Sequence, residues 1–134
     1  MLDLIYLLQS YTKTDLESMV ILLCVTDATM RPFMHDSRPT EEVLKTPKPS
    51  NEIRGAISRR MIAEKTGLSR ETVRRKTQEL ADAGLVTIDA DDRVRSAQRL
   101  DEADFAQTVE AGHSAVVRYI RRLRSYGIEC EAVP

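Results

Sequence analysis

The sequence predicts a mainly α-helical fold that contains a small β element. Three observations lead to this prediction. Apolar residues recur at helical spacings in several segments of the 134-residue chain. A glycine-containing turn separates two of these segments in the middle of the chain. Two short strand-like runs then flank an Asp-rich turn, which is the pattern of a β-hairpin. The length suits one domain with a hydrophobic core of its own.

Two helices are predicted in the N-terminal part. Residues 2–11 form a short apolar segment at helical spacing. Thr14 and Glu17 then have the spacing of a capping box, in which Thr14 caps a helix from Asp15 to about Met30 and Glu17 reaches back. The apolar residues of this second helix cover more than one face. We therefore expect it to be buried, either within the fold or against another subunit.

The centre of the chain predicts two consecutive helices. Ser58 is a suitable N-cap for a helix that ends near Lys65. Gly67 can adopt the left-handed conformation that the turn after this helix requires. Ser69 then caps a second helix over residues 69–82. Three residues at helical spacing are expected to face inward from it: Val73, Thr77 and Leu80.

Two strands and one long helix are predicted next. Residues 85–88 and 93–95 predict short strands around the turn at residues 89–92. A last helix is expected from Asp101, as its cap, to about Ser125. Six of its residues recur at alternating spacings of three and four, the a/d pattern of a helix that packs along another long helix: Ala106, Val109, His113, Val116, Ile120 and Leu123.

The positive charge of the chain is concentrated in its central segment. The whole chain has a net charge of −1, but residues 54–99 hold 11 Lys/Arg against 7 Asp/Glu, which gives +4. Residues 1–53 and 100–134 carry net charges of −3 and −2. A locally basic segment in an otherwise acidic chain is typical of an element that binds nucleic acid.

Charged residues gather at the start of the helix over 69–82: Arg70, Glu71, Arg74 and Arg75. A helix fits the major groove of duplex DNA and presents its N-terminal half to base edges. The arginine fork matches guanine O6 and N7, and a carboxylate accepts from cytosine N4. The helix dipole disfavours positive charge near a helix N-terminus. Arginines at this position therefore indicate a functional surface rather than an inert one. We therefore predict that the chain binds double-stranded DNA and that these four residues read bases.

Residues 57–95 resemble the winged helix-turn-helix of bacterial transcription regulators. The run Gly67-Leu68-Ser69-Arg70-Glu71-Thr72-Val73, with Arg75, is similar to the DNA-binding domain of the cyclic-AMP receptor protein family. The ending Leu80…Gly84-Leu85-Val86 is similar to the MarR and GntR families. The 50 residues before the motif are too few for a cyclic-nucleotide barrel, so that control is not expected here. The layout, with helices before and one long helix after the hairpin, is closer to MarR-type regulators.

The resemblance implies a sequence-specific transcription regulator whose recognition helix, residues 69–82, lies in the major groove. It places Arg70, Glu71 and Arg75 at base-reading positions. The remaining candidates are expected at the DNA backbone, two of them on the hairpin that forms the wing. These phosphate-binding candidates are Ser58, Arg59, Arg60, Ser69, Thr72, Arg93 and Arg95.

We expect the chain to be organised in three regions. Residues 1–50 hold the N-terminal helices and a proline-containing loop or linker, and residues 51–99 form the winged helix-turn-helix. Residues 100–134 hold the long C-terminal helix. The resemblance to MarR-type regulators and the a/d pattern both indicate that the first and last regions form a homodimer.

Two further hypotheses stay open at this point. A winged helix can also dock a protein partner and never read bases, in which case the arginines form a solvated or protein-binding face. A small-molecule effector near residues 15–50 is compatible with DNA binding, but the sequence does not identify such a ligand.

Other classes of function are not supported by the sequence. We find no P-loop, dinucleotide fingerprint or catalytic triad pattern, and we expect neither an enzyme nor a cofactor. His35 and His113 are far apart, and the Asp-rich turn lacks the glycine and glutamate of a calcium loop, so no metal site is expected. Without a leader or a membrane-length apolar segment, and with two isolated cysteines, the chain is expected to be cytoplasmic with reduced thiols.

Overall fold

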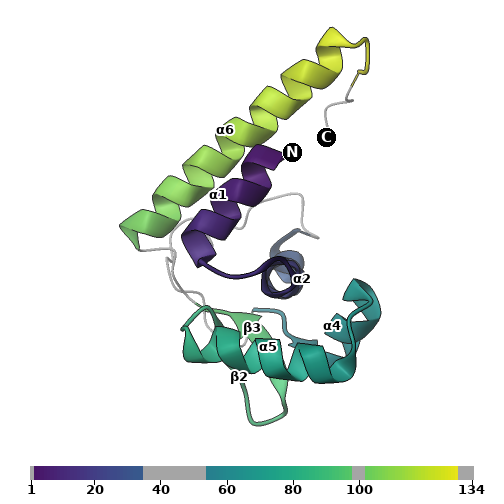
Figure 1. Ribbon diagram of the computed structural model, residues 1–134, viewed down its shortest axis with the longest axis vertical. Coiled ribbons are helices and arrows are strands. Elements are labelled where there is room, and N and C mark those ends of the chain that lie inside the picture. The colour runs from purple at the N-terminus through teal and green to yellow at the C-terminus, as the bar shows by residue number, and fades with distance from the viewer. Residues whose placement is uncertain (1, 35–53, 98–101, 130–134) are drawn as a thin grey trace. The chain divides into compact units, whose positions relative to one another are not determined.

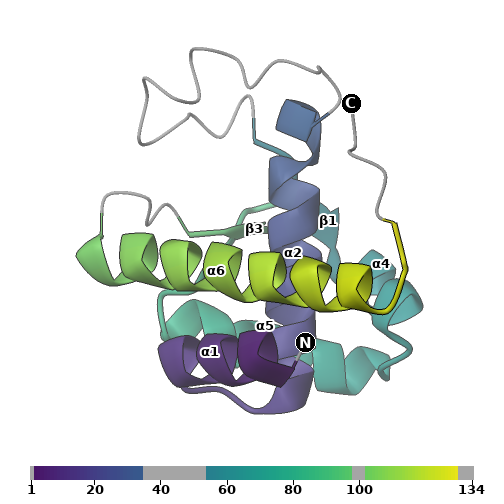
Figure 2. The ribbon, with the colours of Figure 1, turned by 90° about the horizontal axis from the view of Figure 1, so that it is seen from above.

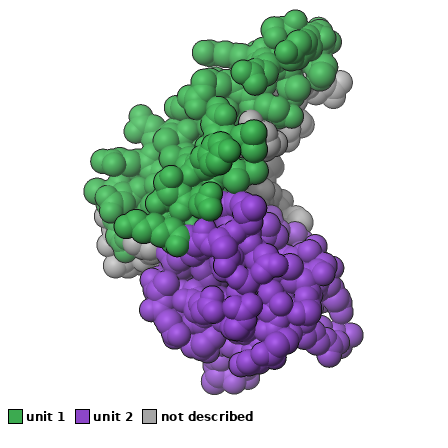
Figure 3. All heavy atoms as spheres, in the orientation of Figure 1, with its two compact units in different colours: residues 1–13, 102–134 green, residues 14–101 purple. Residues whose placement is uncertain are grey.

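The structure is a computed structural model that describes residues 2–34, 54–97 and 102–129 (Figure 1). Within these residues the chain forms five helices and one three-stranded antiparallel sheet, so the fold is mainly helical, as predicted. The chain divides into two compact units (Figure 3). Unit 1 comprises residues 1–13 and 102–134, and unit 2 comprises residues 14–101.

Unit 2 contains the hydrophobic core. Helix α2 (Leu16–Met34) packs against α4 (Arg59–Thr66), α5 (Arg70–Asp82) and the sheet. Ile21 and Val25 of α2 are completely buried. They form one cluster with residues from the other elements of the unit: Ile57, Ile62, Val73, Leu80, Leu85, Val86 and Val94. The predicted burial of the second helix is therefore met only in part within the fold, because Leu16, Val20 and Leu23 remain 57%, 44% and 47% exposed.

The sheet has one strand more than the sequence predicted. The expected hairpin is formed by β2 (Val86–Ile88) and β3 (Arg93–Ser96), with Val86 opposite Ser96. The additional strand, β1 (Ile57–Ser58), pairs with the other side of β3 and gives the order β1-β3-β2. A strand of two residues has no periodicity that a sequence could reveal, and pairing with a distant segment creates it.

Helix α2 begins and ends later than predicted. The Asp15 carboxylate caps the helix and accepts a hydrogen bond from the Ser18 N–H at 2.8 Å, a cap that was not expected from the sequence. The helix continues through Pro32 to Met34 instead of ending near residue 30. The sequence predicts a loop or linker over residues 31–50, but its first four residues are helical, and the remainder, residues 35–50, lies outside the described residues.

The two central helices begin at the predicted caps. The Ser58 hydroxyl accepts from the Met61 N–H at 3.2 Å, and the Ser69 hydroxyl accepts from the Thr72 N–H at 3.1 Å. Between the helices, Gly67 has a φ of 74°, the left-handed conformation that a side chain would disfavour. The Thr77 hydroxyl donates to the Val73 carbonyl at 2.7 Å, which satisfies this buried hydroxyl within the inner face.

Unit 1 is an antiparallel pair of helices. Helix α1 (Leu2–Thr12) lies along the first part of α6 (Ala103–Ser125) (Figure 2). The rings of Tyr11 and Phe105 meet edge to face with centroids 6.3 Å apart. At the other end of α1, Asp3 lies 3.8 Å from the Arg118 guanidinium. Helix α6 begins at Ala103, and the predicted cap, Asp101, lies outside the described residues.

The boundary between the two units differs from the predicted regions. The sequence separated residues 1–50 from residues 51–99, whereas the structure places α1 in unit 1 and α2 in unit 2. The reason is that α2 supplies two fully buried residues to the core of unit 2. No helix among the described residues is both long and apolar enough to span a bilayer.

Candidate nucleic-acid interface

Helix α5 has one buried face and one charged, exposed face. Val73, Lys76, Thr77 and Leu80 are its buried residues. The opposite face carries two kinds of charge along its length. Its first two turns expose Arg70, Glu71, Arg74 and Arg75, and its last turns expose Gln78, Glu79 and Asp82. The N-terminal half of the exposed face is therefore basic and the C-terminal half acidic.

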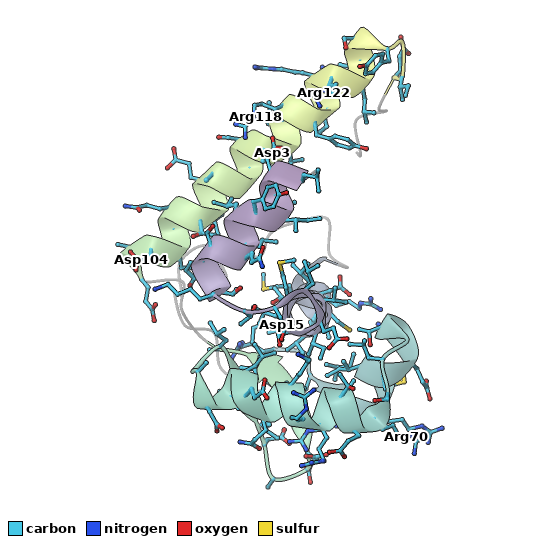
Figure 4. The ribbon with its side chains drawn as sticks, in the orientation of Figure 1. Asp3, Asp15, Arg70, Asp104, Arg118 and Arg122 are labelled. Carbon is cyan, nitrogen blue, oxygen red and sulfur yellow. The ribbon has the colours of Figure 1, made fainter. Side chains whose placement is uncertain are left out.

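Arg70 is the first residue of α5 and extends away from the ribbon (Figure 4). Its side chain has no hydrogen-bond or ion-pair partner among the residues that the structure describes. It directly follows Ser69, which caps only the Thr72 N–H and leaves the earlier amides of the helix directed outward. An unpaired guanidinium therefore stands beside free backbone donors, a combination that suits a nucleic-acid ligand.

Glu71 and Arg74 form a two-point contact on the exposed face. The Arg74 Nε and Nη2 atoms donate to the two carboxylate oxygens of Glu71, at 3.1 and 2.6 Å. This contact lowers the pKa of Glu71 and raises that of Arg74. It leaves the Nη1 hydrogens of Arg74 and one hydrogen of Nη2 for another acceptor. One turn further, Arg75 Nη1 lies 3.3 Å from Glu79 Oε1.

The start of α4 brings together the predicted phosphate-binding residues Ser58, Arg59 and Arg60. The Ser58 hydroxyl caps the helix, and Arg60 is exposed with its Nε 3.1 Å from Glu64 Oε1. Arg59 is mostly buried, and its Nη2 lies 3.5 Å from the Asp92 carboxylate of the hairpin. The Thr72 hydroxyl, on the first turn of α5, accepts a hydrogen bond from the Ser69 hydroxyl at 2.8 Å.

The two arginines of the hairpin have different surroundings. Arg93 is exposed, and its side chain has no partner among the described residues. Arg95 is mostly buried, and its Nη1 donates to Asp89 at 2.6 Å. The Arg93 N–H also donates to Asp89, so backbone and side-chain donors together lower the pKa of that carboxyl. The tip exposes Asp91 and Asp92, which gives it an acidic character.

Lys76 is a polar residue of α5 that sequence reasoning missed. Its side chain is only 5% exposed, and its ammonium lies 2.5 Å from Asp15 and 3.4 Å from Glu17 at the start of α2. The hydrogen bond with Lys76, and next the Ser18 N–H, lower the pKa of Asp15 to about 2. The contact with Asp15 raises the pKa of Lys76. Its place three residues after Val73 and four before Leu80 was the available signal of burial.

Arg54 is a second buried cation outside the predicted set. It precedes β1, and its guanidinium donates to the Ser96 carbonyl at the end of β3. Burial, and next the charge of Arg95, lower the pKa of Arg54. This arginine links the segment before β1 to the end of β3. Because its side chain is buried, it is not available to a ligand.

The N-terminal half of the exposed face of α5 carries groups that could bind an anion. These groups are guanidinium donors and helix amides, beside the Glu71 carboxylate that is paired with Arg74. Among the described residues, no three His, Cys, Asp or Glu side chains are grouped so as to hold a metal ion. The chain matches none of the protein-family models, curated proteins or solved structures with which it was compared.

Proposed function

We propose that unit 2 is a winged helix-turn-helix and that the protein is a cytoplasmic transcription regulator that binds double-stranded DNA sequence-specifically. In this proposal α4 and α5 are the helix-turn-helix, α5 is the recognition helix, and the β2–β3 hairpin is the wing. The observation that carries the proposal is the exposed N-terminal half of α5, where Arg70 is unpaired and the helix amides are free.

The geometry supports different roles for the basic residues. Arg70 and Arg75 are assigned to guanine O6 and N7 because their forks can reach a groove floor from the leading turns of α5. Arg74 is assigned to the same task with its fork held in place by Glu71. Ser58, Arg60, Ser69 and Thr72 border α5 and are assigned to phosphates.

The wing is assigned a smaller role than the sequence suggested. Arg59 and Arg95 are engaged by wing carboxylates and are mostly buried, so they contribute less to phosphate binding than expected. Arg93 is exposed and remains the wing residue proposed to touch the DNA backbone. The acidic tip is expected to stay clear of the phosphates, because like charges repel.

The proposal includes a homodimer, as for most helix-turn-helix regulators that read two half-sites. Two copies would present two α5 helices about one turn of DNA apart, which is 34–36 Å for the symmetric arrangement. The preferred operator is then a near-palindrome. Unit 1, with its long α6, is the part of the chain proposed to join the copies.

The decisive experiment selects bound sequences from random duplexes and then compares variants on the selected site. Arg70→Ala is expected to cost about 1–3 kcal/mol of binding free energy and to relax the preference at one base pair per half-site. Arg31→Ala is the matched control, because it removes an exposed arginine from the last turn of α2, outside α4, α5 and the hairpin, where it pairs with Asp27. Fluorescence anisotropy with selected and scrambled duplexes measures both effects.

Two outcomes would contradict the proposal. The first is equal binding of selected and scrambled duplexes, and the second is an Arg70→Ala variant that loses no more affinity than Arg31→Ala. Binding to a protein partner without any salt-dependent affinity for DNA would instead support the alternative, an interaction module that reads no bases.

A further inference from the structure

Unit 1 lacks a core that could hold two helices together on its own. Among its described residues, Ala115 alone is buried. Large apolar side chains of both helices and of the segment after α6 stay exposed instead: Leu2, Tyr6, Val109, Val116, Tyr119, Tyr126 and Ile128. A helix pair with this little burial gains too little from the hydrophobic effect to offset the entropy of ordering it. The unit therefore needs another surface against it.

Helix α1 does not cover the face of α6 that carries the a/d pattern. The α1 leucines Leu4 and Leu7 lie against Gly112, and Tyr11 lies against Phe105. The a/d residues lie on the neighbouring face of the helix. On that face Val109 is 55% and Val116 is 42% exposed. We call the six a/d residues Ala106, Val109, His113, Val116, Ile120 and Leu123 the α6 seam.

The α6 seam is complementary to itself in the antiparallel direction. Its spacings of three, four, three, four and three read the same from either end. A second α6 that runs in the opposite direction therefore places each seam residue beside another seam residue. In this register Ala106 lies beside Leu123 of the partner subunit, Val109 beside Ile120 of the partner subunit, and His113 beside Val116 of the partner subunit.

The charges of α6 favour the same direction. The N-terminal half carries Glu102, Asp104 and Glu110 without a Lys or Arg. The C-terminal half carries Arg118, Arg121, Arg122 and Arg124 without an Asp or Glu. Antiparallel pairing brings each acidic half beside a basic half, and it also opposes the two helix dipoles. Parallel pairing would place like charges beside each other.

We propose that a second copy of the chain docks antiparallel along the α6 seam, in the register given above. This inference rests on the homodimer of the proposed function, and it adds which surface joins the two copies and in which direction. The seam supplies the apolar contact, and the opposite charges of the two halves determine direction and register. The two copies are related by one two-fold axis, which passes between the midpoints of their two α6 helices. The interface therefore closes on itself, and the assembly stops at a dimer.

The first test measures the oligomeric state of two matched lysine variants of the full chain by sedimentation equilibrium. Val109→Lys adds a charge to the seam, whereas Ala111→Lys adds the same charge to an exposed position of α6 outside it. Both sites are exposed in the single chain and lysine favours a helix, so neither change is expected to unfold the protein. Val109→Lys should weaken the dimer at least about tenfold, and Ala111→Lys should leave it unchanged.

The second test determines direction by disulfide formation in a background without the natural cysteines, Cys24→Ala and Cys130→Ser. A mixture of Val109→Cys and Ile120→Cys chains should form a cross-linked dimer, and neither variant should cross-link by itself. Cross-linking of each variant alone would show a parallel pair and overturn the proposal. A Val109→Lys chain that stays as dimeric as Ala111→Lys would also overturn it.

A third measurement separates this inference from the proposed function. A monomeric Val109→Lys chain should still bind a single half-site, and Arg70→Ala should still relax its base preference. If that binding is present but the dimer does not depend on the seam, only the interface is wrong. If no duplex is bound in any oligomeric state, the DNA-binding function is wrong while the seam remains testable by sedimentation and cross-linking.

Discussion

At the scale of single residues, Lys76 connects α5 to the start of α2. Its ammonium is buried, and a buried cation is tolerated only when it is paired. Asp15 supplies that pair and also caps α2 through the Ser18 N–H. One carboxylate thus fixes both the N-terminus of α2 and the side of α5 opposite the proposed DNA contact.

The two tasks of Asp15 can be separated by substitution. Asp15→Asn keeps an N-cap but removes the charge, and it is expected to cost about 1 kcal/mol of stability, since Asp15 itself is more than half exposed and screened by water. Asp15→Ala removes the cap as well and should cost about 1 kcal/mol more. Urea denaturation measures both, with Asp27→Asn as the control for an exposed ion pair on the same helix. Equal stability of Asp15→Asn and wild type would mean that Glu17 alone holds Lys76.

The same ion pair predicts how stability depends on pH. The folded-state pKa of Asp15, about 2, is below the ordinary value of 3.8. Its contribution is therefore present above about pH 4 and is lost as the pH falls toward 2. The raised pKa of Lys76 acts at the other end, because that contribution persists below its usual value of 10.5 and is lost as the pH rises beyond it. Asp15→Asn should flatten the acid limb of the stability profile.

At the scale of elements, two glycines lie where one element packs against another, and they differ in how much space a side chain would find there. A Cβ at Gly112 would meet Leu4 Cδ1 at 3.6 Å, which is an ordinary contact between α6 and α1. A Cβ at Gly55 would lie 2.0 Å from the Ala28 carbonyl oxygen of α2. The Gly55 N–H also donates to the Thr29 carbonyl at 3.1 Å, so the chain entering β1 is held directly against the α2 backbone.

The two glycines should therefore respond in opposite directions to alanine. Gly112→Ala is expected to stabilise the protein by about 0.5–1 kcal/mol, because it removes the entropic cost of glycine inside a helix. Gly55→Ala is expected to destabilise it by about 1–3 kcal/mol, because α2 and β1 must move apart. Thermal unfolding followed by circular dichroism compares the two. A destabilising Gly112→Ala would contradict the described packing of α1 on α6.

At the scale of the whole molecule, a chain with a net charge of −1 is proposed to bind a polyanion. This is consistent only if the positive charge is local, as it is over residues 54–99. The acidic wing tip and the acidic end of α5 border the basic patch on the same unit. They limit the number of phosphates that the surface can neutralise.

The salt dependence of binding should report that limited number. The logarithm of the association constant is expected to fall linearly with the logarithm of salt concentration. Arg60→Ala and Arg93→Ala should each reduce the slope by about 1 per bound copy and weaken all sequences alike. Arg31→Ala, on α2 where Arg31 pairs with Asp27, should leave the slope unchanged. An Arg93→Ala variant with the wild-type slope would remove the wing from the proposed contact.

Local patterns in the sequence determined most of the secondary structure and the surface of α5. Ser58 and Ser69 specify the starts of two helices because their hydroxyls cap neighbouring amides, and Gly67 specifies the turn because its φ is positive. The spacing of Val73, Thr77 and Leu80 specifies the inner face of α5 and hence where its arginines lie. Each of these signals acts within a few residues, so the sequence alone contains it.

The tertiary structure decided what depends on segments far apart in the chain. Strand β1 exists because Ile57 pairs with Val94, and α2 belongs to unit 2 because Ile21 and Val25 fill its core. The pairing of Lys76 with Asp15 and the burial of Arg95 against Asp89 in the β2–β3 hairpin follow in the same way. These outcomes arise from packing and charge between distant residues, and periodicity along one segment carries no information about its distant neighbours.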